Sequence, residues 1–248
     1  QYLTLVAALI LIFKGSVDSP VPWHLWPQIK ARLWQPVALK ALFNLNRDIL
    51  VRTFALVMAM SLFTSFSAGM GDRILGVNTL LIQIVLMAAY FMDGIALAVE
   101  SYAGNFYGQR ATNDLGWLLL FGALGSMALG VAIALVLMLW PTPFFSLLTS
   151  HKILLDQIPT YVGWLLPVLG LGGVAFTLDG YFLGLTAGRT LRNATLIAAF
   201  LGFLPLAIVA SHIASVHLLW LAMTGLMAMR AILLGRQILP TLVPNRSL

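Results

Sequence analysis

Six long, continuous apolar stretches constrain the fold of this chain more than any other feature of its sequence. Each has about 20–28 residues, enough for an α-helix to cross the hydrocarbon core of a bilayer. Because a bilayer offers no water to the backbone, such a segment satisfies its hydrogen bonds as a helix. The sequence therefore predicts an all-α fold, a polytopic membrane helix bundle with six transmembrane helices. The predicted spans are Ile49–Met70, Ile74–Val99, Leu115–Trp140, Ile158–Leu185, Thr190–Ala210 and Val216–Leu239.

The composition agrees with a lipid environment. Only 9% of the residues are charged and 60% are apolar, whereas a soluble domain carries roughly 25% charged residues. The net charge of +6 alone would allow nucleic-acid binding, but the basic residues form no stripe on a soluble face. The chain has no cysteine, which excludes disulfides and thiolate metal sites. We expect the lipid bilayer as a partner, and no nucleic acid.

The region before the first span has a different character. Tyr2–Phe13 is apolar but too short to cross a bilayer, and we interpret it as the end of a truncated transmembrane helix. Further on, Gln28–Trp34 and Val37–Leu45 have the pattern of short amphipathic helices that lie on a membrane surface. The chain then divides into a helix stub (1–13), a cytoplasmic loop with interfacial helices (14–48), a six-helix transmembrane unit (49–240) and a cytoplasmic tail (241–248).

The basic residues predict the orientation. If the loop 14–48 is placed on one side and six spans alternate from there, all but two of the 14 Lys and Arg residues fall on that side. The two exceptions are Arg73 and Lys152. Cytoplasmic loops are enriched in Lys and Arg, so we expect a multi-pass protein of the plasma membrane with its C-terminus in the cytoplasm.

Three acidic residues lie inside the apolar spans and are candidate ion-coupling residues: Asp93, Glu100 and Asp179. An unpaired charge near the bilayer centre costs at least about 2.5–3.5 kcal/mol, so such residues face protein or water. Asp93 and Glu100 are spaced to share one helix face, about 10 Å apart. The structural alternatives are that Glu100 pairs with Arg52 or Arg230, that Asp93 is paired, and that Asp179 is a hydrogen-bonded helix clamp.

Four aromatic residues near these acids are candidate substrate-cavity contacts for an organic cation: Tyr90, Phe91, Phe176 and Tyr181. The four histidines show no metal-ligand spacing, and the motifs HExxH, GxSxG and the P-loop are absent from the sequence. We therefore expect no catalytic residue, no metal and no cofactor, and a secondary active transporter in place of an enzyme.

Several short motifs, in this order, resemble one transporter family. They are Leu45–Ile49 (LNRDI), Met92–Glu100 (MDGIALAVE), Tyr107–Arg110 (YGQR) and Leu178–Gly180 (LDG) followed by Gly184. Together with the hydropathy pattern they resemble the C-terminal lobe of the DinF branch of the MATE (multidrug and toxic compound extrusion) transporters. The resemblance covers nearly the whole chain.

The resemblance implies a twelve-helix protein of a bacterial inner membrane, whose missing N-terminal lobe is a partner of this chain. It also implies export of a small organic substrate by alternating access, driven by H⁺ or Na⁺. Asp179 matches the acidic position in helix ten that is implicated in cation coupling. Asp93 and Glu100 match acidic positions in helix eight of the DinF branch. Helix seven offers only Asp48 at its entrance, which argues against a Na⁺ site built there.

Two other functions remain open at this level. A flippase for lipid-linked precursors would need intramembrane Arg or Lys for an anionic headgroup, and Arg230 is the single basic candidate at depth. A membrane scaffold would use its acids as helix–helix hydrogen bonds. The cation-coupled antiporter is the first hypothesis because the intramembrane charge is acidic.

Overall fold

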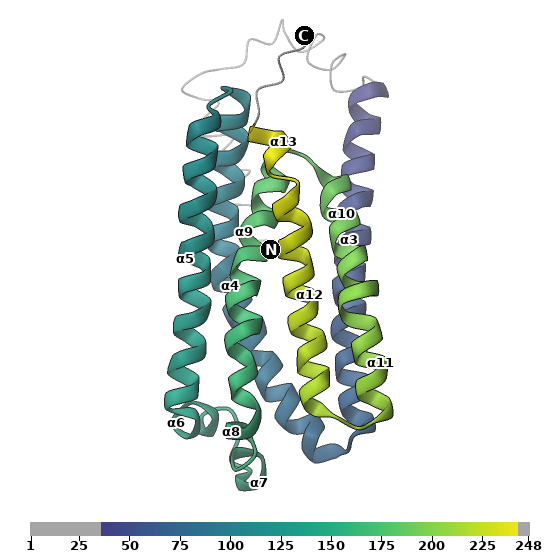
Figure 1. The fold of residues 1–248 in the computed structure, drawn as a ribbon, viewed down its shortest axis with the longest axis vertical. Coiled ribbons are helices and arrows are strands. Elements are labelled where there is room, and N and C mark those ends of the chain that lie inside the picture. The colour runs from purple at the N-terminus through teal and green to yellow at the C-terminus, as the bar shows by residue number, and fades with distance from the viewer. Residues whose placement is uncertain (1–35, 243–248) are drawn as a thin grey trace, which may run out of the picture. The chain divides into compact units, whose positions relative to one another are not determined.

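The computed structural model describes residues 36–242, and within that range every regular element is a helix. Predictions that concern residues 1–35, including the stub and Gln28–Trp34, and residues 243–248 of the tail lie outside the described residues. The long helices, in chain order, are α3 (Pro36–Gly69), α4 (Asp72–Gly108), α5 (Thr112–Leu139), α9 (Leu165–Gly184), α10 (Gly188–Ile197), α11 (Leu204–His212) and α12 (Val216–Arg236) (Figure 1).

The chain separates into two compact units, Gln1–Asn44 and Leu45–Leu248. The described part of the first unit, residues 36–44, is helical and belongs to the beginning of α3. All contacts discussed below lie within the second unit.

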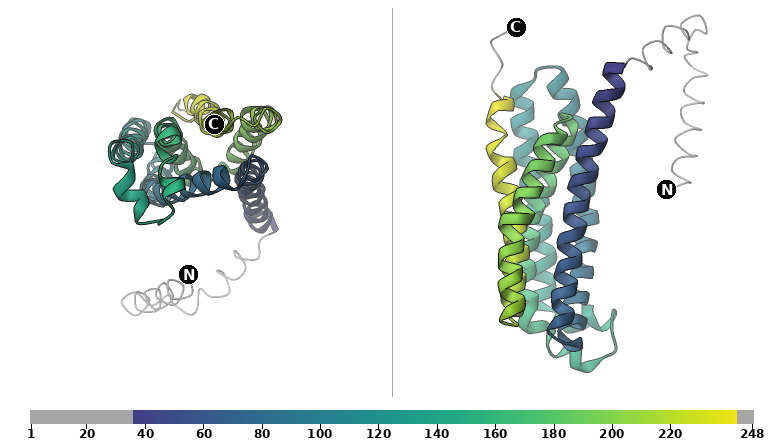
Figure 2. Two further views of the ribbon diagram at one scale, coloured as in Figure 1. Left: turned by 90° about the horizontal axis from the view of Figure 1, so that it is seen from below. Right: turned by 90° about the vertical axis from the view of Figure 1, so that its right-hand side faces the viewer.

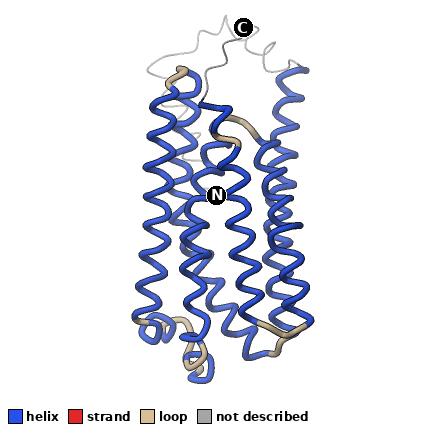
Figure 3. Tube along the Cα trace, viewed as in Figure 1, coloured by secondary structure: helices blue, strands red, loops and turns tan. Residues whose placement is uncertain are grey.

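The prediction of six spans is confirmed within residues 36–242, where six helices are long and apolar enough to cross a membrane. By length and hydropathy they are Phe43–Gly69, Asp72–Gly108, Thr112–Leu139, Lys152–Gly184, Gly188–His212 and Val216–Thr241. Short helices lie at one end of the unit (Figure 3). The helix α6 (Pro141–Ser146) follows the third span, and the fourth span begins with α7 (Lys152–Leu155), α8 (Ile158–Tyr161) and the 3₁₀-helix η2 (Val162–Trp164). A last turn, α13 (Leu239–Leu242), follows α12.

Two helices extend beyond their predicted ends. Val37–Leu45 does not form a separate helix but the first turns of α3, since Pro36 suits a first helical turn and neither proline nor glycine follows before Gly69. Likewise α4 continues past Val99 to Gly108, so Glu100 lies two turns inside its helix.

Helix α9 occupies the centre of the bundle and packs against α4, α5 and α12 (Figure 1). Its small residues make this possible. A Cβ at Gly173 would lie 2.5 Å from the carbonyl oxygen of Ser126 in α5, and one at Gly184 would lie 2.3 Å from that of Glu100 in α4. Small residues let helix backbones approach closely, and α9 is accordingly the most buried span.

The fifth span is not a uniform α-helix. Between α10 and α11 the residues Ala198–Phe203 form a π-helix, η3. Pro205, the second residue after this π-helix, lacks the N–H that an α-helical turn would use. A π-helix widens the helix locally and occurs frequently at functional sites. The side view in Figure 2 shows α10 and α11 running alongside α3.

Candidate functional site

A buried carboxylate between two arginines forms the centre of the candidate site. Asp179 of α9 is only 3% exposed. Its Oδ2 accepts hydrogen bonds from the guanidinium groups of Arg52 in α3 and Arg230 in α12, and both contacts are ion pairs. Three helices that are far apart in the sequence therefore meet at one carboxylate oxygen.

Arg230 is enclosed by further contacts. It is 1% exposed, its guanidinium carbon lies 5.7 Å from the centre of the Phe176 ring, and its Nη1 lies 3.6 Å from the sulfur of Met227. A cation over an aromatic face is attracted by the ring electrons. Phe176, which was expected to receive a substrate cation, thus contacts a cation of the protein itself.

The three charged groups keep unused hydrogen-bonding capacity. Within residues 36–242, Oδ1 of Asp179 and the Nε–H groups of Arg52 and Arg230 are buried and have no protein partner. Buried polar atoms are almost always hydrogen-bonded. The site can therefore accept additional polar contacts without breaking an existing ion pair.

Asp93 of α4 is the second acid of the site. Its side chain is exposed on the surface of the unit, about one helical turn before Ala96, where α4 crosses α9 beside Asp179. No ion pair to Asp93 forms among the described residues. With all four groups ionised, two acids balance two bases. Loss of the Asp93 charge would leave the site with a net positive charge.

Glu100 is not part of this cluster. It is half-buried on α4, and in the described part of the chain it has no ion pair. The interpretation that Glu100 pairs with Arg52 or Arg230 is wrong, because both arginines bind Asp179. At Gly184, α9 crosses close to the backbone of Glu100. This contact involves the Glu100 carbonyl and not its side chain.

The four candidate aromatics do not form one cavity wall. Tyr90 and Phe91 lie on the exposed side of α4, with 77% of Tyr90 accessible. Tyr181, in contrast, is fully buried, and its hydroxyl is 2.7 Å from that of Thr241. Tyr181 thus joins α9 to the end of the last span, while Phe176 packs over Arg230.

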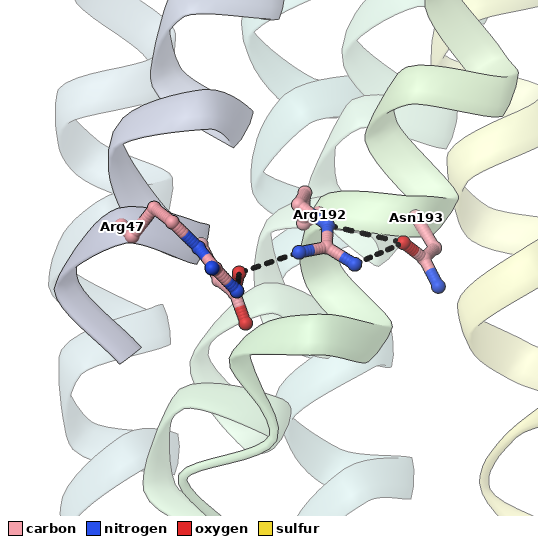
Figure 4. Close-up of polar contacts among 4 residues, drawn as sticks. Arg47, Arg192 and Asn193 are labelled. Carbon is pink, nitrogen blue, oxygen red and sulfur yellow. Dashed lines mark hydrogen bonds and ion pairs between the residues drawn. The ribbon is translucent and has the colours of Figure 1, made fainter. Parts of the chain in front are cut away.

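Sequence reasoning missed Arg52 as a site residue, because it was counted with the basic residues at the helix ends. The predicted span begins at Ile49, which leaves Arg52 close to its end, whereas the helix of the structure spans from Phe43 and places Arg52 nine residues inside it. It also missed a second charge cluster. There the buried Asp48 of α3 accepts a hydrogen bond from Arg192 of α10 at 2.6 Å and a longer one from Arg47 at 3.3 Å (Figure 4).

Metal ligation finds no support in this part of the molecule. Between residues 36 and 242, no three His, Asp or Glu side chains come together in an arrangement that could hold a metal ion.

Six spanning helices around a buried, charge-balanced cluster define a polytopic membrane protein with an intramembrane polar site. Comparison with known proteins identifies the family of this membrane protein, because the MatE family profile matches residues 49–211. The chain belongs to the MatE family, whose members are transporters and not enzymes.

Two curated relatives agree with this assignment. The chain is 32% identical to DNA damage-inducible protein F of Escherichia coli over 198 residues, which cover 79% of this chain and 42% of the relative. It is 26% identical to the chloroplastic Protein DETOXIFICATION 44 of Arabidopsis thaliana over 182 residues, which cover 73% of this chain and 34% of the relative. The chain thus spans less than half the length of either relative.

Proposed function

We propose that this chain is the C-terminal half of a cation-coupled antiporter that exports small organic, cationic or amphipathic compounds by alternating access. The coupling ion is H⁺ or Na⁺. Membership of the MatE family supports transport, and one relative is named for detoxification. The observation that carries the proposal is the charge cluster of Asp179, Arg52 and Arg230 with the exposed Asp93 in electrostatic range.

Asp93 is the better cation acceptor of the two acids. Asp179 is already matched by two guanidinium groups, so a cation that replaced them would leave buried arginines without a counterion, which is costly. Asp93 is exposed on α4 and can exchange its cation with the cavity. The coupling role that the sequence suggested for Asp179 therefore moves, in this proposal, to Asp93, and Asp179 holds the arginines in place.

Exchange follows from the charge balance. With Asp93 ionised, the cluster is neutral and an organic cation can bind against the carboxylate. When H⁺ or Na⁺ occupies Asp93, the two arginines outweigh Asp179 by one charge, and the organic cation is repelled. The two ligands thus exclude each other, and each favours the conformation that binds it better. Tyr90, which is exposed on α4 about one helical turn before Asp93, would supply an aromatic contact.

A flippase for lipid-linked precursors is the second candidate. One observation favours it more than the sequence did: Arg52 joins Arg230 inside the bundle, so two basic groups meet there. The two positive charges, however, are already balanced by the negative charges of Asp179 and Asp93. An anionic headgroup would have to displace an ion pair, whereas an organic cation needs only Asp93.

The test uses inverted membrane vesicles that carry the complete transporter and an imposed proton gradient. A fluorescent organic cation is added with and without Na⁺, and dissipation of the gradient or Na⁺-dependent uptake is followed. We expect Asp93→Asn to abolish exchange, because the amide cannot carry the exchanged charge. Asp114→Asn, at an exposed helix end, is the matched control and should exchange like the wild type.

Two outcomes would contradict the proposal. Exchange by Asp93→Asn at the wild-type rate would remove Asp93 from the coupling step. Absence of exchange with every cation, together with translocation of a fluorescent anionic lipid that Arg52→Gln abolishes, would establish the flippase in its place.

A further inference from the structure

An apolar groove runs along the outside of the unit between α3 and the π-helical span. It has a volume of about 150 Å³. No polar side chain lines it; the principal residues are Val51, Phe54 and Met58 of α3 and Leu196, Phe200 and Phe203 of the α10–η3–α11 span. Phe54 and Phe200 are largely exposed, so the groove is open on the outer surface of the unit, between two spanning segments.

The π-helix and a glycine pair shape this groove. On the side of η3 that faces α12, Gly202 lies so close to Gly225 that a Cβ at position 202 would be 2.9 Å from the Gly225 carbonyl oxygen. The widened π-helical turn is thereby held against α12. Its other side carries Phe200 and Phe203 into the groove. The groove is thus built by the local helix geometry and is not an accidental gap.

The second charge cluster, formed by Arg47, Asp48 and Arg192, lies at one end of the groove. Its residues precede the groove residues by one helical turn in both helices. Arg47 and Asp48 precede Val51 by four and three residues, and Arg192 precedes Leu196 by four, so all three continue the faces that line the groove. Asp48 is 2% exposed and pairs with both arginines. One carboxylate therefore faces two guanidinium groups, and the cluster has a net charge of one positive unit.

The position of this excess charge suits a lipid headgroup. Arg47 and Arg192 each lie four residues inside the beginning of a spanning segment, Phe43–Gly69 and Gly188–His212, a depth from which arginine side chains reach the headgroup layer. Arg47 is largely exposed, and Arg192 also contacts the Asn193 amide oxygen (Figure 4).

We propose that the apolar groove between α3 and the α10–η3–α11 span, together with Arg47 and Arg192 at its end, is a binding site for one anionic phospholipid. An acyl chain fills the groove, and the phosphate accepts hydrogen bonds from the two guanidinium groups, which bind phosphate oxygens in a planar fork. The proposal does not depend on what the protein transports. The charge excess favours an anionic lipid over a zwitterionic one.

Native mass spectrometry of the detergent-purified protein tests this site. The protein is incubated with equal amounts of dioleoyl phosphatidylglycerol and dioleoyl phosphatidylethanolamine, and the retained lipids are counted. We expect preferential retention of one phosphatidylglycerol. Each arginine near a lipid phosphate contributes about 1 kcal/mol, so Arg47→Gln should lower that preference about fivefold. Arg47 is exposed, and its loss leaves the Asp48–Arg192 pair intact.

Two controls separate this site from general lipid adhesion. Arg189→Gln removes the same charge from an exposed position of α10 that has no contact with Asp48, and it should retain the wild-type preference. Ala199→Phe fills the groove and should reduce retention of both lipids, whereas Leu201→Phe, on the same π-helix but outside the groove, should not.

Three results would overturn the proposal: equal retention of the two lipids by the wild type, an unchanged preference in Arg47→Gln, or unchanged retention in Ala199→Phe. Each would mean that something other than an anionic lipid covers this groove.

Discussion

Gly180 of α9 crosses α4 so closely at Ala96 that a Cβ at position 180 would lie 2.2 Å from the Ala96 carbonyl oxygen. This crossing adjoins the charge cluster. Asp179 precedes Gly180 directly, and Asp93 lies one helical turn before Ala96. The close approach of the two backbones therefore determines how near the two carboxylates come to each other.

Gly180→Ala should destabilise the bundle, because the added methyl group meets backbone that cannot move aside. Overpacking of this kind costs about 1–3 kcal/mol, and we expect a lower melting temperature in detergent and weaker transport. Gly94→Ala on α4 is the control, since a Cβ there has no atom within 4 Å. Equal melting temperatures for the two variants would show that α4 and α9 can separate without cost.

Asp179→Asn should destabilise the protein more than any other single charge removal. It leaves the fully buried Arg230 without a counterion, and breaking a buried pair costs about 3–5 kcal/mol. Removal of both charges in Asp179→Asn with Arg230→Gln should recover part of that loss, and a double-mutant cycle on melting temperatures measures the coupling. Additive effects of the two substitutions would mean that the ion pair contributes nothing.

A buried hydrogen-bond chain stabilises the opposite end of the unit. Asn78 of α4 donates to the Ser67 hydroxyl of α3 at 2.8 Å and accepts from the Trp220 indole of α12 at 2.9 Å. Asn78→Leu leaves the Trp220 indole N–H without a partner, at about 1–3 kcal/mol, while the Ser67 hydroxyl still donates to the Phe63 carbonyl. We therefore expect a lower melting temperature and a changed tryptophan emission. Thr79→Val, at an exposed neighbouring position, should change neither. Wild-type stability of Asn78→Leu would contradict this role.

The exposed face of α4 should line the aqueous cavity of the complete transporter. The chain has no cysteine, so a cysteine introduced into it reports accessibility when the rest of the transporter is also made free of cysteine. Leu97→Cys, at a position 64% exposed, should react with a membrane-impermeant maleimide, while Met92→Cys, on the buried face, should not. Reaction of Leu97→Cys with lipid-soluble maleimide alone would place this face against lipid.

The predicted orientation can be tested with the same chemistry. The loop around Arg110 and the loop around Ser150 lie at opposite ends of α5. Because the predicted topology puts twelve of the 14 basic residues on the Arg110 side, we expect Arg110→Cys to be labelled from outside in inverted vesicles. Ser150→Cys should be labelled in right-side-out vesicles. The reverse pattern would show that the C-terminus is not cytoplasmic.

The sequence by itself determined the fold class, the number of spans and the presence of acidic residues within the apolar spans. These properties depend on local physics. An apolar segment of this length must be helical in lipid, and an acid within it must find a partner or water. Asp93 and Asp179 could be singled out for that reason before any contact was known, and the family resemblance followed from short motifs such as Met92–Glu100.

Only the tertiary structure decided which charges meet. Arg52 and Arg230 are 127 and 51 residues from Asp179 along the chain, and helical periodicity within one span carries no information about its partner in another. Packing likewise separated Tyr181, which is buried against Thr241, from the exposed Tyr90. Neighbouring helices determine whether a side chain faces protein or open space. Close backbone crossings, such as that of Gly180 at Ala96, position these helices, and they join residues that are far apart in the sequence.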